Sequence, residues 1–254
     1  MAPFLRLRQV CLVAADLARE TALVKSALGL EECYRDANVA KYGLENVLFP
    51  VGTSFLEIVS PTRPGTAAGR FLERHGGRYG YMVILDCEDP ARRQSHALSL
   101  GMRIANVIRH DGYFGVQLHP KDTGAAMLEF NSTEGGDDPM GPYAPAGPNW
   151  QAAIRSDTTR RLLAVEIDCP DAGRLASRWG ELLERTVAAL GDGSYRIALD
   201  AGAINFLLGT APEAVLAGIE LESAQPRNSA ISVCGVRVRF TGTALAAGAA
   251  SVER

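Results

Sequence analysis

SFLEIVSP (residues 54–61) places a glutamate, Glu57, in the middle of an apolar strand, and AAMLEFN (residues 125–131) does the same with Glu129. The glutamates stand seventy-two residues apart, and the landmarks around them recur at that distance or one residue more: Gln9 with Met82, Asp16 with Asp89, and Gly29 with Gly101. A buried carboxylate costs several kcal/mol unless it is paired, protonated or bound to a cation. The repeat therefore predicts two modules of one kind over residues 9–131, with a polar site shared between them.

Each module is predicted to contain a strand, a helix and three further strands. In the first module Asp16 can accept the free N–H groups at a helix start, and Gly29 suits the helix end. The predicted elements are a strand at 7–14, a helix at 17–28, and extended segments near 31–35, 46–51 and 54–60. The second module repeats them as a strand at 81–87, a helix from Pro90 to Leu100, and strands at 103–109, 113–119 and 126–131. A short helix at 66–77 is expected to link the two.

The C-terminal part is predicted to repeat the pattern in degraded form. Residues 132–149 hold four Gly and four Pro, which is typical of a linker or a long surface loop. A third copy is expected in residues 162–209, where alignment on Asp171 puts Ala164 at the position of Gln9 and Phe206 at that of Glu57. Apolar strands at 216–223 and 231–240 could begin a fourth copy, and the tail 241–254 is expected to fray.

These patterns divide the chain into three parts. We expect a two-module domain (residues 1–131), a Gly/Pro-rich linker (132–159) and degenerate C-terminal modules (160–254). Since the aligned positions of the third copy carry no metal-binding side chain, the C-terminal part is predicted to be scaffold. It would cover the N-terminal site or replace a contact between two chains.

Bulk composition excludes several classes of function. The 254 residues carry a net charge of −3 with a pI near 5.9, so nothing indicates a nucleic-acid or membrane partner. No apolar run approaches the roughly 20 residues of a membrane span, and MAPFLRLRQV lacks a secretory signal core. The five cysteines are widely spaced without a CxxC, which predicts reduced, buried thiols. We expect a soluble cytoplasmic protein, monomeric or homodimeric, that acts on a small molecule.

Strand alternation places the candidate site residues together. Gln9, Glu57 and Glu129 each fall on the strand face opposite the one expected to meet the helices, so they should line one concave surface. Oxygen donors of this kind suit a hard or borderline divalent cation. The alternative is that each is a surface residue on a half-exposed sheet. No nucleotide-binding or serine-hydrolase motif is present.

Three segments carry a resemblance to a known family: LRQVCLVAADL (7–17), SFLEIVSP (54–61) and LHPKDTGAAMLEF (118–130). They resemble the vicinal oxygen chelate superfamily, which includes glyoxalase I, methylmalonyl-CoA epimerase, extradiol dioxygenases and fosfomycin- and bleomycin-resistance proteins. The resemblance covers residues 6–131 well and 160–209 weakly. It implies an α+β fold of tandem βαβββ modules, two complete, with a third and a partial fourth degenerate. Their curled mixed sheets would form a cup around one divalent metal ion.

By this resemblance the metal ligands fall at Gln9, Glu57, Met82 and Glu129. Met82 departs from the pattern, because the family usually has histidine there and a thioether binds Mg, Mn, Fe or Zn poorly. Water, or one of the histidines that bracket the second hairpin (His110 and His119), could fill that position. Further candidate substrate contacts are Tyr81, Met82, Tyr113, His119 and Lys121.

Two functions follow as expectations. The first is an isomerase or lyase in which a divalent metal on Gln9, Glu57 and Glu129 polarises vicinal oxygens of a carbonyl or hydroxyacid substrate, with Glu57 or Glu129 as general base. Ring-cleaving dioxygenation fits less well, because both histidine positions that it uses in the family are changed. The second is a metal-free protein of the same fold that binds and sequesters a small ligand. Met82 favours it by making the cup more apolar.

Overall fold

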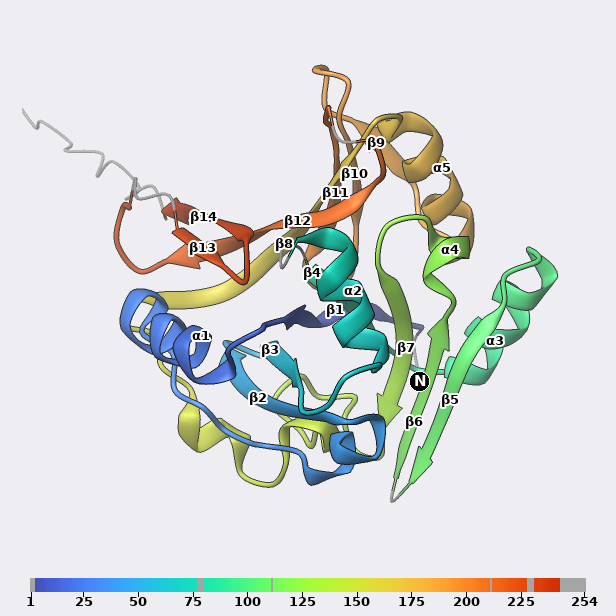
Figure 1. Ribbon diagram of the computed structural model, residues 1–254. Helices are drawn as coiled ribbons and strands as arrows, with labels where there is room; N and C mark the ends of the chain where they lie inside the picture. Colours follow the sequence, from blue (N-terminus) through green and yellow to red (C-terminus); the bar gives the residue numbers. More distant parts are fainter. Residues whose placement is uncertain (1–2, 77–79, 111, 211, 228–230, 243–254) are drawn as a thin grey trace, which may run out of the picture.

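One open, curled mixed sheet of fourteen strands runs through the described part of the chain (Figure 1). The computed structural model describes residues 3–76, 80–110, 112–210, 212–227 and 231–242. The prediction of an α+β fold built from βαβββ modules is confirmed. Within the described residues no helix is long and apolar enough to cross a membrane.

The first module begins with a strand whose last residue precedes a capped helix. Its elements are β1 (Leu5–Val13), α1 (Leu17–Leu23), a π-helical turn η1 (Val24–Leu28), a 3-10 helix η2 (Ala37–Tyr42), β2 (Leu44–Val51) and β3 (Ser54–Pro61). The carboxylate of Asp16 accepts a hydrogen bond from the N–H of Arg19, and Gly29 ends the helix with φ +66°. β3 lies parallel to β1, and β2 lies antiparallel to β3.

The prediction of a strand near residues 31–35 is wrong. Only a single bridge forms there, between Tyr34 and Leu48 at the outer edge of β2. The chain then leaves the sheet because the Asp36 carboxylate caps η2, where it accepts a hydrogen bond from the N–H of Asn38. The turn chemistry of Asp36 outweighs the extended tendency of the preceding residues.

The second module repeats the first with all its strands. Its elements are β4 (Gly80–Cys87), α3 (Pro90–Ser99), β5 (Ile104–His110), β6 (Tyr113–Leu118), a short helix α4 (Pro120–Thr123) and β7 (Met127–Thr133). The linking helix α2 (Ala67–His75) also forms as predicted. β1 and β4 pair antiparallel, with Gln9 opposite Ile84 and Cys11 opposite Met82. The first strands of the two modules therefore meet at the centre of the sheet.

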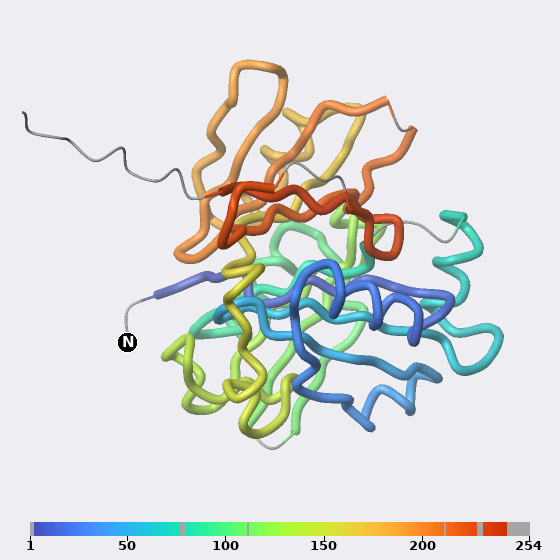
Figure 2. Tube along the Cα trace, turned by 90° about the vertical axis from the view of Figure 1, so that its left-hand side faces the viewer, coloured from blue at the N-terminus to red at the C-terminus, as the bar shows by residue number. Residues whose placement is uncertain are grey.

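The C-terminal half copies this arrangement and stacks on the first half (Figure 2). A full third module comprises β8 (Thr159–Cys169), α5 (Ala172–Leu183), β9 (Val187–Ala189), β10 (Tyr195–Ala198) and β11 (Ala203–Leu208). The partial fourth comprises β12 (Val215–Ser223), β13 (Ile231–Val233) and β14 (Val236–Gly242). β8 and β12 pair antiparallel, as β1 and β4 do.

The single strand expected at 231–240 is in fact a hairpin. Cys234 (φ +51°) and Gly235 (φ +73°) are both left-handed and form its two-residue turn. Two consecutive positive φ values give the turn that joins antiparallel strands most tightly. The tail expected to fray lies, from residue 243 onward, outside the described residues.

The register of the third module also differs by one residue from the prediction. Ala164 does take the place of Gln9, but Asn205, and not Phe206, takes that of Glu57. The pairing shows this, because Glu57 lies beside Cys11 and Asn205 lies beside Glu166, two residues after Ala164. The Asp171 cap aligns the first strand well, whereas the loops before the last strand differ in length between modules.

Ion pairs lie at the positions of the C-terminal half that correspond to the glutamate site of the first half. Arg239 takes the position of Glu129, since it pairs with Glu220 on β12 as Glu129 pairs with Ile84 on β4. Its guanidinium lies 2.6 Å from the buried carboxylate of Glu166. Burial raises the pKa of Glu166, and the Arg239 and Arg237 charges oppose that shift.

Trp179 joins the two halves. Its indole is fully buried on α5, donates a 2.8 Å hydrogen bond to the carbonyl of Thr123 in α4, and meets Phe206 edge to face at 5.6 Å.

All five cysteines are free thiols, and four of them are buried, whereas Cys33 is half-buried.

Replacing Trp179 by Ala should lower the free energy of unfolding by about 3–5 kcal/mol, because a large buried ring and its hydrogen bond are lost together. Urea unfolding measures the change. Leu208→Ala is the matched control, since Leu208 is 59% exposed and should change stability little. A loss below about 1 kcal/mol for Trp179→Ala would show that the halves do not depend on this contact.

Candidate functional site

A cavity of about 910 Å³ opens on the concave side of the first half. The sheet strands β1, β3, β4 and β7 form its floor, and α2, η2 and β5 contribute to its walls. It is lined by every candidate residue predicted from the sequence: Gln9, Glu57, Tyr81, Met82, His110, Tyr113, His119, Lys121 and Glu129. The structure thus brings Gln9, Glu57 and Glu129 to one concave surface, and their metal-binding and catalytic roles stay predictions.

Glu57 is held at the floor by two neutral amides. Its Oε2 accepts a 2.7 Å hydrogen bond from Gln9 Nε2 on β1, and its Oε1 accepts one of 2.7 Å from Asn46 Nδ2 on β2. The carboxylate is only 8% exposed. Hydrogen bonds to a charged group contribute about 1.5–3 kcal/mol each, which offsets part of the cost of burial.

Glu129 is held in the same way by the second module. Its Oε1 accepts hydrogen bonds from the Tyr113 hydroxyl and, at 3.2 Å, from Asn131 Nδ2. Its Oε2 accepts one of 2.7 Å from Gln117 Nε2, which lies directly opposite on β6. Glu129 is only 3% exposed, so each carboxylate relies on neutral donors of its own module.

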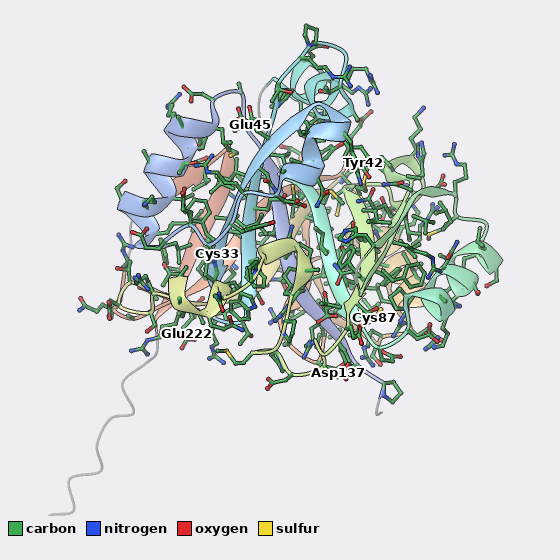
Figure 3. The ribbon with its side chains drawn as sticks, turned by 90° about the horizontal axis from the view of Figure 1, so that it is seen from below. Cys33, Tyr42, Glu45, Cys87, Asp137 and Glu222 are labelled. Atoms are coloured by element: carbon green, nitrogen blue, oxygen red, sulfur yellow. The ribbon has the colours of Figure 1, made fainter. Side chains whose placement is uncertain are left out.

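A tyrosine from the Gly/Pro-rich segment joins the two sets of contacts. The Tyr143 hydroxyl donates a 2.9 Å hydrogen bond to Gln9 Oε1 and lies 3.4 Å from Asn131 Nδ2, which donates to it. Its ring stacks on Phe55 at 4.8 Å, beside Trp150. Cys33, labelled in Figure 3, packs against the same aromatic cluster. Residues expected to be a linker therefore form part of the floor of the site.

Burial governs the electrostatics of these groups. It raises the pKa of Glu57, the Asn46 amide lowers it in part, and the charge of Glu129 raises it further. Burial and the Glu129 charge also raise the pKa of Tyr113 well above its usual range, so the hydroxyl keeps its proton. Burial and Glu57 do the same to the Cys11 thiol. The site thus pairs carboxylates with groups that stay neutral.

The other part of the floor is apolar, and Met82 belongs to it. Met82 is 7% exposed and packs with Cys11, Val59 and Ile84 against the inner face of α2, which lies across the sheet in Figure 1. Phe71 of α2 covers this cluster. A thioether suits such a surface because it is flexible and polarisable. Met82 therefore acts as a packing residue at the position where the resemblance would place a histidine.

The remaining predicted residues lie at the cavity wall. Tyr81 meets Phe71 edge to face at 5.2 Å, and burial raises its pKa to about 12. His119 caps α4, with Nδ1 accepting from the N–H of Lys121 at 3.2 Å. His110 stacks on Tyr113 at 5.3 Å. Within the described residues, neither histidine forms a hydrogen bond with Glu57 or Glu129.

The donor set fits a divalent cation poorly. Each of the four carboxylate oxygens of Glu57 and Glu129 already accepts a side-chain hydrogen bond, and the carbonyl oxygen of Gln9 accepts one from Tyr143. A cation at these side chains would have to share the oxygens with the N–H and O–H groups or displace those groups. Among the residues that the structure describes, no group of three or more His, Cys, Asp or Glu is arranged to hold a metal ion.

Sequence reasoning named Gln9 and Tyr113 but missed the other side chains that hold the site together. Gln117 could have been found, because the closing hairpin puts it directly across from Glu129. Asn46 is a polar residue in an otherwise apolar strand, diagonal to Glu57 in the antiparallel pair. Tyr143 had no such signal, since it reaches the site from a loop without periodic pattern.

Replacing Glu57 by Gln should favour the folded state increasingly as the pH rises. A carboxyl with a raised pKa binds its proton more tightly when folded, so its contribution is fully present below the ordinary value of 4.5 and is lost as the pH rises through the raised pKa. The difference in free energy of unfolding between Glu57→Gln and wild type should therefore shift toward the variant from about pH 4 to about pH 8. Urea unfolding at both pH values measures it.

Glu45→Gln is the matched control, because Glu45 is an exposed carboxylate on the neighbouring strand β2 (Figure 3). If the free energy of unfolding of the two variants showed the same pH dependence, burial would not raise the pKa of Glu57.

Comparison with known proteins supports the fold. No family model and no curated protein matches the sequence. A solved structure of a hypothetical protein from Staphylococcus aureus is similar over 94% of this chain and 99% of that chain, with a TM-score of 0.72 and 12% identity. The arrangement of both halves therefore recurs in a solved structure.

Partial matches include two methylmalonyl-CoA epimerases. That of Streptomyces coelicolor, in complex with 2-nitronate-propionyl-CoA, is 20% identical and covers 51% of this chain and 98% of its own, with a TM-score of 0.47. That of Mycobacterium tuberculosis is 20% identical and covers 50% and 87%, with a TM-score of 0.45. Likeness at this level carries no argument about activity. By its module topology, the chain has the βαβββ fold that its resemblance to the vicinal oxygen chelate superfamily implies.

Proposed function

We propose that the protein is an enzyme that moves a proton on a small organic molecule bound in the cavity. One observation carries the proposal: two buried carboxylates line one cavity, and burial raises the pKa of Glu57. A raised pKa makes a carboxylate a stronger base near neutral pH, which is the usual condition for general-base catalysis. The amides of Gln9 and Asn46 hold that base in one orientation.

The proposed step is the removal of a proton from a carbon next to a carbonyl group. The C–H bond breaks, the proton goes to a Glu57 oxygen, and the electron pair moves to the carbonyl oxygen as an enolate. Tyr113 keeps its proton because its pKa is raised, so its hydroxyl can turn from Glu129 to donate a hydrogen bond to that oxygen.

Two outcomes of the enolate correspond to the expected reaction classes. Return of a proton to carbon, from Glu57 or from Glu129, gives an isomerisation. Expulsion of a leaving group from the adjacent carbon gives a lyase reaction. The second carboxylate supports either outcome, since a site with two carboxyl groups can accept and deliver a proton at different atoms.

Metal use by Gln9, Glu57 and Glu129 stays a prediction from the resemblance. The hydrogen bonds that the three side chains already make do not favour it, and the proposed proton transfer uses the side chains alone.

A binding protein without catalysis is the second candidate. It is favoured by the apolar cluster around Met82, which suits ligand binding. It is also favoured by the hydrogen bonds of the carboxylate oxygens, because a pocket whose polar groups are all satisfied can bind a ligand without reacting with it. Proton exchange on a bound compound separates the two.

Glu57→Gln should abolish proton exchange while leaving binding largely intact. Small carbonyl and hydroxyacid compounds would first be screened for binding by saturation-transfer NMR. Loss of the C–H signal next to the carbonyl would then be followed in D₂O. Exchange should fall by about 10²–10⁴-fold in Glu57→Gln, because a positioned base is lost. Glu45→Gln should keep the wild-type rate. If compounds bind the wild type but their C–H proton never exchanges with solvent, the catalytic proposal is contradicted and the second candidate, a binding protein, is supported.

The protein purified without a polyhistidine tag should hold well under one divalent ion per chain, because its carboxylates are engaged by N–H and O–H donors. Elemental analysis by mass spectrometry measures this directly. The opposite result would be one ion per wild-type chain that is absent from both Glu57→Ala and Glu129→Ala. It would restore the metal site.

A further inference from the structure

Four basic side chains line the same cavity whose floor carries the two glutamates. They come from three separate elements: Lys41 of η2, Arg70 and Arg74 of α2, and Lys121 of α4. All four are exposed, so they lie toward its mouth, whereas Glu57 and Glu129 are buried. The chain as a whole is acidic, with a net charge of −3. The mouth of the cavity is therefore positively charged, although the protein as a whole is negatively charged.

These cations are not used by the fold. Within the described ranges none of the four forms an ion pair with a carboxylate, although arginines elsewhere do so: Arg92 with Glu184 at 2.6 Å and Arg103 with Asp122 at 2.7 Å are examples. The contacts recorded for the four are a hydrogen bond from Arg70 to the carbonyl of Gly65 and the ammonium of Lys41 over the Tyr42 ring at 5.0 Å.

One carboxylate besides the two glutamates lines the described cavity, and it is already engaged. Asp36 Oδ1 accepts hydrogen bonds of 2.9 Å from the backbone N–H and from the side-chain amide of Asn38, where it caps η2. In the described chain it forms no ion pair with any of the four basic side chains.

We propose that the ligand of this cavity is an organic anion. Its charged group binds at the mouth, between Arg70 and Arg74 of α2 and the two lysines. Its uncharged part reaches the floor beside Glu57 and Glu129. The orientation follows from charge, since an anion at the floor would meet two buried carboxylates, whereas the mouth carries four cations against the single carboxylate of Asp36.

Helix α2 can contact both the charged and the uncharged part of such a ligand. Arg70 and Arg74 are one turn apart, and Phe71 beside them packs on the apolar floor cluster of Met82 and Ile84. The same helix therefore offers apolar contact inside the cavity and positive charge outside it. A carboxylate and a phosphate ester would both satisfy this arrangement.

The inference rests on the proposed small-molecule site, but its test uses binding alone and needs no catalysis. Two fluorescent probes share one aromatic core: 8-anilinonaphthalene-1-sulfonate is anionic, and N-phenyl-1-naphthylamine is neutral. The wild type should bind the anionic probe more tightly. About 1 M salt, where the screening length falls to roughly 3 Å, should weaken binding of the anionic probe alone.

The double variant Arg70→Gln/Arg74→Gln should weaken the anionic probe about five- to tenfold in Kd and leave the neutral probe unchanged. Arg19→Gln/Arg178→Gln is the control with the same change in charge, because both arginines are exposed and lie outside the cavity. It should bind both probes as the wild type does. Thermal unfolding of each variant establishes that it is folded.

Displacement of the anionic probe then distinguishes the two anions. Benzoate and phenyl phosphate are compared with neutral benzamide, and the anion that competes better identifies the preferred group. Equal affinity for the two probes, or an unchanged Kd in Arg70→Gln/Arg74→Gln, would overturn the proposal. So would competition by benzamide as strong as that of the anions. Loss of exchange activity in Glu57→Gln has no bearing on these outcomes.

Discussion

The burial of two carboxylates in one cavity is the constraint on which the rest of the site depends. Antiparallel pairing of β1 with β4 brings the modules together, and the parallel neighbours β3 and β7 then carry Glu57 and Glu129 to the same surface. Each charge leaves water at a cost of several kcal/mol. The protein meets that cost with amide and phenol donors instead of counter-charges. Because these donors are neutral, one carboxyl group can exchange its proton without breaking an ion pair.

The two halves of the molecule share one strand arrangement but carry different side chains at equivalent positions. At the positions of Glu57 and Glu129, the C-terminal half has Asn205 and Arg239, and its buried Glu166 pairs with Arg239. Gly218 stands where Met82 does, and a Cβ there would lie 2.3 Å from the Glu166 carboxylate. On the C-terminal face the charges thus pair with one another. The N-terminal face keeps its glutamates apart from cations and remains open to a ligand.

Elements outside the repeat give the cavity its character. Helix α2 lies between the modules in sequence, covers the apolar floor near Met82 and brings arginines to the mouth. The loop between β7 and β8 supplies Tyr143, which connects Gln9 with Asn131 and rests on Phe55. Neither segment belongs to a βαβββ module. A site built on a symmetric frame therefore becomes polar at the floor, apolar at one side and basic at its mouth.

The sequence by itself determined the modules, the helix caps at Asp16, Asp89 and Asp171, and the shared face of Gln9, Glu57 and Glu129. Strand alternation and capping are local rules, so a repeated pattern is enough to apply them. Tertiary structure alone decided that Tyr143 completes the floor, that Met82 packs under α2, and that Asn205 replaces Glu57 in the third module. These features depend on loop lengths and on contacts between distant segments. No local periodicity encodes such contacts, because they form only when the sheets curl and the halves stack.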